Sequence, residues 1–209
     1  MPPGYGFGLD ERVVEYPWIF ARLQDHHQIL LDAGSSLNHF DILTLPALRD
    51  RKLYISTLDD EGKHDAPCQP EYVYEDLRHS SFPDEFFDAI ICLSTLEHVG
   101  MDNTFLYTDN EEKRESNRWA FLEAVTEFKR LLKKGGILYL TVPYGRYKNH
   151  GWFQVFDAEM IRSVLDTFTP DSFTVDYFKY EHRQWQYAAA EACQDGYFFD
   201  VHHDYQLKI

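Results

Sequence analysis

Residues 29–36 join a short aliphatic segment to an acidic residue and a glycine turn, in the order Ile29-Leu30-Leu31-Asp32-Ala33-Gly34-Ser35-Ser36. Three aliphatic residues in a row are typical of a parallel strand that is covered on both faces. Gly34 allows a close approach of the backbone, or a positive φ, that a side chain would obstruct. The pattern therefore predicts a strand that opens onto a nucleotide-binding turn, and the alternative is an ordinary strand followed by a turn.

Three more predicted strands end in polar residues. The strand at 52–58 is followed by Asp59, the strand at 72–74 by Glu75 and Asp76, and the strand at 88–93 by residues 94–98. In doubly wound parallel sheets the ligand lies across the carboxyl ends of the strands, at the switch in strand order. We therefore expect these residues to lie together with residues 32–36 in one ligand site.

Helical segments alternate with these strands. Amphipathic spacing predicts a helix within residues 10–28, which begins near Pro17 after an irregular or helical lead-in. It also predicts helices at 119–132, ended by Gly135-Gly136, and at 158–168, with a helix or an irregular crossover at 37–48. Further strands are predicted at 137–142, 172–180 and 197–207. The alternation indicates an α/β fold, a doubly wound and mostly parallel sheet whose last strand is antiparallel. Residues 101–117 are polar and longer than a routine crossover, and we interpret them as a lid or a partner surface.

Length and composition limit the function. The 209 residues suit a single domain, and a formal net charge of −15 argues against a nucleic-acid partner, which needs a basic face. No apolar run approaches the roughly 20 residues that span a bilayer, and residues 1–8 lack both a basic leader and an apolar core. We therefore expect a cytoplasmic protein with no membrane partner. Three cysteines, far apart in the chain, argue against a disulfide framework.

Other catalytic chemistries lack their motifs. Adjacent histidines, at 26–27 and 202–203, would point to opposite faces of a strand and make a poor chelate, so no metal site is predicted. No Gly-x-Ser-x-Gly elbow occurs, and neither does Gly-Lys-Ser or Gly-Lys-Thr. A nicotinamide-dependent oxidoreductase is a further alternative, although the full Gly-x-Gly-x-x-Gly fingerprint is missing.

Four segments in this order resemble the motifs of the class I S-adenosylmethionine-dependent methyltransferases: residues 31–36, 74–78, 86–99 and 131–143. The resemblance covers roughly residues 29–143 and is strongest to a short, single-domain branch with a Leu-Glu-His segment, here Leu96-Glu97-His98, after the fourth strand. It implies a Rossmann-like fold with a helical segment (1–28), a cofactor-binding core (29–143) and a substrate side (144–209). The cofactor it implies is S-adenosyl-L-methionine.

The resemblance also implies a role for each residue of the first turn. Asp32 would lie near the cofactor amine and Gly34 beside the methionine moiety, while Ser35 and Ser36 would add hydroxyl or amide contacts. The chain departs from the family pattern, because Ser36 and Asn38 stand where further glycines are common. Either the turn is wider or the cofactor sits differently.

The other strand ends receive roles in the same way. Asp59 would accept hydrogen bonds from the ribose hydroxyls, with Thr57 as a competing alignment. Asp76 would accept from the adenine amino group, with the Leu77 amide against the ring, and its alternative role is a helix or turn cap. Ser94 would complete the cofactor contacts.

Two histidines are candidates for a general base. His98 would lie near the transferred methyl group, and His150 lies on the loop after the fifth strand, where an acceptor would approach. The alternative for His98 is a structural histidine bonded to a backbone carbonyl.

We predict methyl transfer to an oxygen of a small-molecule or glycan-type acceptor. The alternative is a catalytically inactive binding or scaffold protein with the same fold. The aromatic strands near the carboxyl terminus would line the substrate pocket or bury the face of a homodimer.

Overall fold

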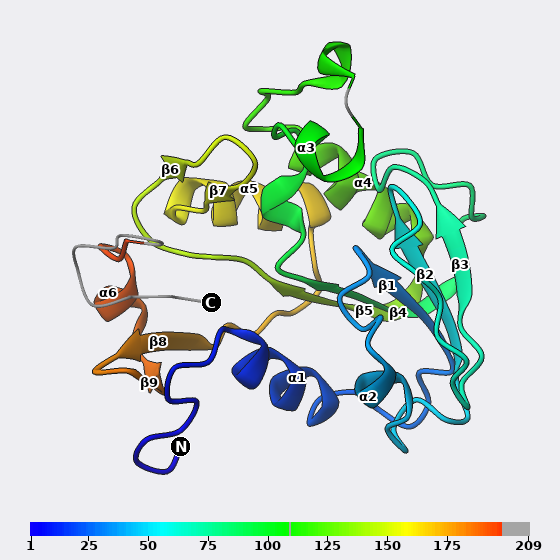
Figure 1. The fold of residues 1–209 in the computed structure, drawn as a ribbon, viewed down its shortest axis with the longest axis horizontal. Helices are drawn as coiled ribbons and strands as arrows, with labels where there is room; N and C mark the ends of the chain where they lie inside the picture. Colours follow the sequence, from blue (N-terminus) through cyan, green and yellow to red (C-terminus); the bar gives the residue numbers. More distant parts are fainter. Residues whose placement is uncertain (109, 198–209) are drawn as a thin grey trace.

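A parallel sheet of five strands forms the centre of the structure, a computed structural model in which residues 1–108 and 110–197 are described (Figure 1). The strand order is β3-β2-β1-β4-β5, with bounds Ile29–Ala33 for β1, Lys52–Thr57 for β2, Glu71–Tyr74 for β3, Phe87–Leu93 for β4 and Leu132–Thr141 for β5. β1 pairs in parallel with both β2 and β4. The predicted doubly wound sheet is confirmed, and its strand order switches between β1 and β4.

Helices cover both faces of this sheet (Figure 1). One face carries α4 (Phe121–Leu131) and α5 (Ala158–Phe168), and the other carries α1 (Arg12–Phe20) and the short α2 (Phe40–Leu43). Successive residues of β4 point to opposite faces, so that Ile90 packs in the core under α4 and Ile91 in the core under α1. Burial on both faces explains the continuous apolar runs at residues 29–31 in β1 and 89–93 in β4.

Helix α1 contains Pro17 in its interior, whereas the sequence predicts a helix that begins near this residue after an irregular or helical lead-in. A proline inside a helix leaves the carbonyl of the residue four positions earlier without its N–H partner. Here that carbonyl belongs to Val13, and it accepts a hydrogen bond from the Tyr5 hydroxyl at 2.9 Å. The helix therefore starts earlier, and Arg12 at its first turn reaches the Leu93 carbonyl at the end of β4 at 3.2 Å.

The predicted helix at 119–132 and the predicted strand at 137–142 meet earlier than expected. Helix α4 ends at Leu131 and β5 begins at Leu132, so Gly135 and its neighbour Gly136 lie within the strand instead of ending the helix. The pairing with β4 is irregular at this point, and Gly135 has a φ of +76°. The glycine pair thus belongs to a local irregularity of the sheet, similar to a bulge.

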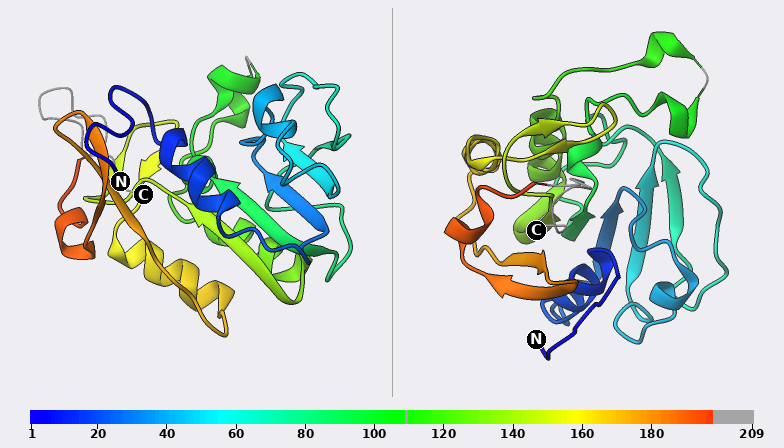
Figure 2. Two further views of the ribbon diagram at one scale, coloured as in Figure 1. Left: turned by 90° about the horizontal axis from the view of Figure 1, so that it is seen from below. Right: turned by 60° about the vertical axis from the view of Figure 1, so that its left-hand side comes forward.

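The prediction that the last strand of the sheet is antiparallel is wrong, because all five strands run parallel. The strand expected at 172–180 is shorter, β8 (Tyr177–Glu181), and it pairs antiparallel with β9 (Gln184–Ala188) in a separate hairpin. The hairpin lies beside the N-terminal segment (Figure 2), where the buried Trp185 donates its backbone N–H to the Tyr5 carbonyl at 2.9 Å. Residues 198–207 of the other predicted strand lie outside the described residues.

Short elements complete the described chain. They are the 3-10 turn η1 (Leu96–His98), α3 (Thr104–Tyr107), the 3-10 turn η2 (Glu111–Lys113), the paired strands β6 (Lys148–Asn149) and β7 (Gln154–Val155), and α6 (Ala190–Cys193). Among the helices of the described residues, none has the length and apolar character to cross a membrane.

Candidate functional site

A cavity of about 650 Å³ lies across the carboxyl ends of β1, β2, β3 and β4. At the strand ends it is lined by Gly34, Ser56, Thr57, Asp59, Asp76, Leu77, Ser94, Thr95 and His98. Helix α1, the segment around α3 and the loop between β6 and β7 contribute Arg12, Met101, Leu106, Tyr107, Glu115 and Trp152. The structure thus brings most of the residues singled out in the sequence to one cavity.

Asp32 lies beneath the glycine turn and does not line this cavity. Its side chain is buried, and its Oδ1 accepts from the Ser36 N–H at 3.1 Å and from the Ser36 hydroxyl at 2.9 Å. Its Oδ2 accepts from the Leu37 N–H at 2.8 Å. Burial raises the pKa of Asp32 to about 7, although these hydrogen bonds oppose the rise. The carboxylate therefore shapes the turn, and no exposed oxygen is left for the cofactor amine that the resemblance assigned to it.

The glycine turn has a backbone conformation that side chains oppose. Gly34 has a φ of +106°, and a Cβ at this position would lie 2.2 Å from Cγ2 of Thr95. Ser35 follows with a φ of +62°, and both Ser35 and Ser36 are buried. Of these three turn residues, Gly34 alone lines the cavity, so the turn presents backbone rather than hydroxyl groups to a ligand.

Both candidates for the ribose contact, Thr57 and Asp59, line the cavity at the end of β2. The Thr57 hydroxyl donates to Oε1 of Glu61 at 2.8 Å, and the Tyr107 hydroxyl donates to the same oxygen at 3.2 Å. Burial, together with the carboxylates of Glu61 and Asp59, raises the pKa of Tyr107 to about 12. Asp59 is therefore the carboxylate that lines this end of the cavity, while Glu61, which the sequence did not single out, lies outside the lining and holds the hydroxyls of Thr57 and Tyr107.

Asp76 is bound by Arg78 two residues further on. The Arg78 Nε lies 3.0 Å from Oδ1 and its Nη2 lies 2.6 Å from Oδ2, while Nη1 and Nη2 contact Glu115 at 2.8 and 2.7 Å. Burial alone would raise the pKa of Asp76, but the hydrogen bonds from Arg78 outweigh burial and lower it. Oδ1 also accepts from the Arg78 N–H at 2.9 Å, so the observed contacts are those of the turn-cap alternative. Leu77 still lines the cavity beside it.

One ring nitrogen of His98 is held by the backbone. Its Nδ1 lies 2.9 Å from the Trp152 carbonyl, which can only accept, so Nδ1 carries the proton and Nε2 is the basic nitrogen. Burial lowers the pKa of His98 and favours the neutral imidazole. Nε2 lies 4.0 Å from Oε1 of Glu97, a buried residue whose pKa is raised well above its ordinary value by burial.

The structure does not bring His150 to the cavity. Its ring stacks on Phe153, with centroids 4.4 Å apart and an interplanar angle of 2°. The residue of this loop that reaches the cavity is Trp152, whose ring lies 5.0 Å from that of His98. An aromatic residue in a loop of aromatic residues carries no sequence signal that would have distinguished it.

A buried carboxylate on α1 forms a hydrogen-bonded group that the sequence analysis also missed. Glu15 is 1% exposed, and its Oε1 accepts from the hydroxyls of Ser94, at 2.6 Å, and Thr141. Its Oε2 accepts from Nη1 of Arg12 at 2.5 Å. Glu15 therefore joins α1 to the ends of β4 and β5, and it orients Ser94 at the cavity.

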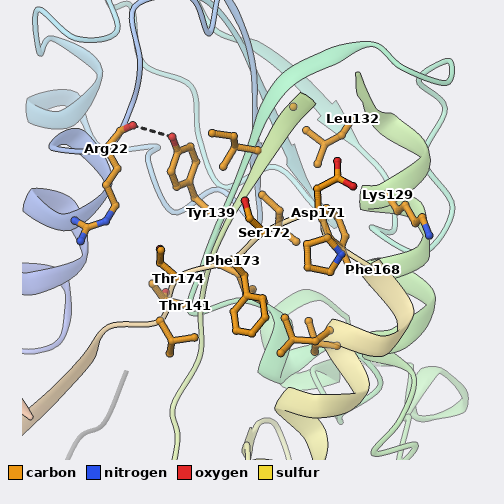
Figure 3. A pocket seen from close by; sticks show the side chains of 18 of the residues that line it. Arg22, Lys129, Leu132, Tyr139, Thr141, Phe168, Asp171, Ser172, Phe173 and Thr174 are labelled. Carbon is orange, nitrogen blue, oxygen red and sulfur yellow. Dashed lines mark hydrogen bonds between the residues drawn. The ribbon is translucent and has the colours of Figure 1, made fainter. Parts of the chain in front are cut away.

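A second and larger cavity, of about 1690 Å³, runs along the outer edge of β5 (Figure 3). Within the described residues β5 pairs only with β4, so its other edge faces this cavity together with Phe168 and Phe173. Figure 3 also shows the Tyr139 hydroxyl donating to the Arg22 carbonyl, at 2.8 Å. None of the candidate residues from the sequence lines this larger cavity, whereas most of them line the smaller one, which is therefore the candidate functional site.

Comparisons with known proteins agree with this fold. Residues 55–140 match a family model described as a methyltransferase domain. The chain is similar to a candidate methyltransferase from Bacillus halodurans, with 16% identity over 79% of this chain and 71% of that one and a TM-score of 0.55. A SAM-dependent methyltransferase from Archaeoglobus fulgidus is 13% identical over 84% of this chain and 75% of that one, with a TM-score of 0.53.

The chain is shorter than several of the proteins that it matches. It spans 56% of the length of the [4+2]-cyclase SpnF, to which it is 18% identical over 74% of its own length, with a TM-score of 0.49. No curated protein matches the sequence at a significant level.

A doubly wound parallel sheet with a ligand cavity at its carboxyl edge defines the class of Rossmann-like α/β proteins. Within this class, residues 55–140, less than half of the chain, match a methyltransferase-domain model, and the motifs of the sequence resemble those of the class I S-adenosylmethionine-dependent methyltransferases. The cofactor of that family is S-adenosyl-L-methionine. The narrower assignment to a branch with a Leu-Glu-His segment stays a prediction.

Proposed function

We propose that this protein transfers the methyl group of S-adenosyl-L-methionine to a hydroxyl oxygen of a small-molecule or sugar-containing acceptor. The observation that carries the proposal is the single cavity across four strand ends, with a glycine turn at β1 and carboxylates beyond β2 and β3. Its volume of about 650 Å³ lies in the range of small-molecule and cofactor sites.

The residues of the cavity fit the cofactor from end to end. At β1, Gly34 lines the cavity without a side chain, so the methionine moiety could approach the backbone there closely. At β2, the buried Ser56 hydroxyl has no hydrogen-bond partner among the described residues, and Asp59 offers acceptors for the ribose hydroxyls. At β3, Leu77 lines the wall where an adenine ring would pack.

His98 is the residue of this chain that we assign as the general base. When bound, S-adenosyl-L-methionine supplies a methyl group on a positively charged sulfur, a good leaving group for in-line displacement. His98 Nε2 takes the proton of the acceptor hydroxyl as the new carbon–oxygen bond forms, because Nδ1 is already donating to the Trp152 carbonyl. Its lowered pKa keeps the imidazole neutral and able to accept that proton at neutral pH.

Isothermal titration with S-adenosyl-L-methionine and with its demethylated product S-adenosylhomocysteine tests the proposal. We expect binding of both, and absence of binding to both at millimolar concentration would reject it. Incubation with labelled cofactor and pools of hydroxylated small molecules then tests the transfer step. Cofactor binding without methylation of any pool would favour the alternative of an inactive binding or scaffold protein.

A further inference from the structure

Arg12 presents an unused pair of donors at the wall of the cavity. The residue lines the cavity, and its side chain is 29% exposed. Nη1 is committed to Oε2 of Glu15, at 2.5 Å, and to the Leu93 carbonyl, at 3.2 Å. Within the described part of the chain, neither Nε nor Nη2 donates a hydrogen bond. These two N–H groups lie on the same edge of the planar guanidinium, which is the edge that binds a carboxylate with two parallel hydrogen bonds.

The guanidinium is anchored rather than mobile. Glu15 is buried, and besides Arg12 it holds the hydroxyls of Ser94 and Thr141. Two contacts hold Nη1, to Glu15 Oε2 at 2.5 Å and to the Leu93 carbonyl at 3.2 Å, and separation of the ion pair would leave the buried Glu15 carboxylate without its cation. A side chain that is already ordered loses little conformational entropy when a ligand binds to it.

Arg12 acts on the methionine end of the proposed cofactor site. Burial raises the pKa of Asp32, and the positive charge of Arg12 opposes that rise. Burial lowers the pKa of His98, and the same charge lowers it further. The contacts agree with these effects: Nη1 of Arg12 and the Thr95 hydroxyl both donate to the Leu93 carbonyl, and Thr95 packs against Gly34. Arg12, Gly34 and His98 line the same cavity.

Arg78, another cation of this cavity, is not available in the same way. Its Nε and Nη2 bind Asp76, and its Nη1 and Nη2 bind Glu115. It therefore has no free edge for a second carboxylate, and it lies at the end of β3 rather than at the turn after β1.

We propose that Arg12 binds the α-carboxylate of the cofactor's methionine moiety through Nε and Nη2. This assignment rests on the proposed function, because it takes S-adenosyl-L-methionine as the ligand. The carboxylate is the one anionic group of that ligand, and Arg12 lines the same cavity as Gly34, the turn residue at which the methionine moiety would lie. Arg12 thereby selects a cofactor with an intact amino-acid end.

The test compares two ligands that differ in this end. S-adenosylhomocysteine has the carboxylate, and 5′-methylthioadenosine lacks the whole amino-acid portion while keeping the ribose and adenine. Titrations use the full chain with Arg12→Gln, with Arg12→Lys, and with Arg22→Gln as a control, since Arg22 pairs with Asp176 outside this cavity. We expect Arg12→Gln to lose about 10- to 100-fold in affinity for S-adenosylhomocysteine, the effect of a charged hydrogen bond.

Affinity for 5′-methylthioadenosine should change less than about twofold in Arg12→Gln, and Arg12→Lys should recover part of the loss for S-adenosylhomocysteine. An equal loss for both ligands would overturn the assignment and leave Arg12 a structural role. Unchanged affinity for both would also overturn it, and a raised KM for acidic acceptors alone would then identify the acceptor as the source of the carboxylate. If the unaltered protein binds neither ligand, the proposed function itself fails.

Arg12→Gln leaves Glu15 without its cation, so thermal unfolding of each variant must accompany the titrations. If Arg12→Gln does not fold, the double variant Arg12→Gln with Glu15→Gln removes both charges and keeps an acceptor for Ser94 and Thr141. The same ligand comparison on the double variant then decides whether Arg12 binds the carboxylate or has only a structural role.

Discussion

Replacement of Asp32 by asparagine is expected to change how the stability of the protein depends on pH. Burial raises the pKa of Asp32 from the ordinary value of 3.8 to about 7 in the folded state. Because the folded pKa is above the unfolded one, the folded protein holds more protons between these two pKa values. Its free energy of unfolding is therefore highest below the unfolded pKa and falls as the pH rises through the folded pKa.

The size of this effect follows from the two pKa values. One pKa unit corresponds to about 1.4 kcal/mol, so the interval from 3.8 to about 7 sets an upper limit of about 4 kcal/mol. Asp32→Asn stays neutral and lacks this pH dependence. It also carries a pH-independent cost of about 1–3 kcal/mol, because an amide cannot accept from both Ser36 and Leu37 at the two positions where the carboxyl oxygens now do so.

Urea unfolding of both proteins at several pH values between about 5 and 8 measures the difference directly. We expect the stability advantage of the unaltered protein to shrink as the pH rises toward 7, by at most about 1.4 kcal/mol per pH unit, and to level off above it. Contributions from Glu97, whose pKa is also raised by burial, cancel in the difference between the two proteins. An advantage that stays constant with pH, or that grows as the pH rises, would show that Asp32 is already ionised in the folded protein.

Three further predictions concern the turn, the base and the segment over the cavity. In Gly34→Ala the new Cβ would sit at a φ of +106° and 2.2 Å from Cγ2 of Thr95, so we expect thermal unfolding to show that the free energy of unfolding falls by about 2–6 kcal/mol. The second substitution Thr95→Ala should recover part of this loss, and no recovery would refute the clash. His98→Gln should lower the methyl-transfer rate about 10²- to 10⁴-fold while the affinity for S-adenosylhomocysteine is kept, and an unchanged rate would remove His98 as the base. Glu115→Gln breaks the contact with Arg78 at a cost below about 1 kcal/mol but should speed amide exchange near residue 115, whereas unchanged exchange would show that this ion pair does not order the segment.

Much of the fold follows from the sequence, because its signals are local. The continuous apolar run of β4 is decided within a few residues, and it predicts a strand buried on both faces. Helix α5 was predicted with the bounds it has, where Asp157 caps its first turn by accepting from the Met160 N–H at 3.0 Å. The placement of Asp59 at the carboxyl edge followed from strand order alone.

Other features were decided by contacts between distant segments. The hairpin of β8 and β9 forms a separate unit with Tyr5, and no local pattern near residue 177 could show that its partner was not the central sheet. Arg12 and Trp152 reach the cavity from segments that precede and follow residues 29–143, and Glu115 supplies a partner for Arg78 from a distant part of the chain. The apolar periodicity of a segment is a property of neighbouring residues, so the sequence alone determined that a doubly wound sheet forms and which strand ends line the candidate cavity. The burial of a side chain, its pKa and its hydrogen-bond partners depend on which segments meet, and only the tertiary structure decides that.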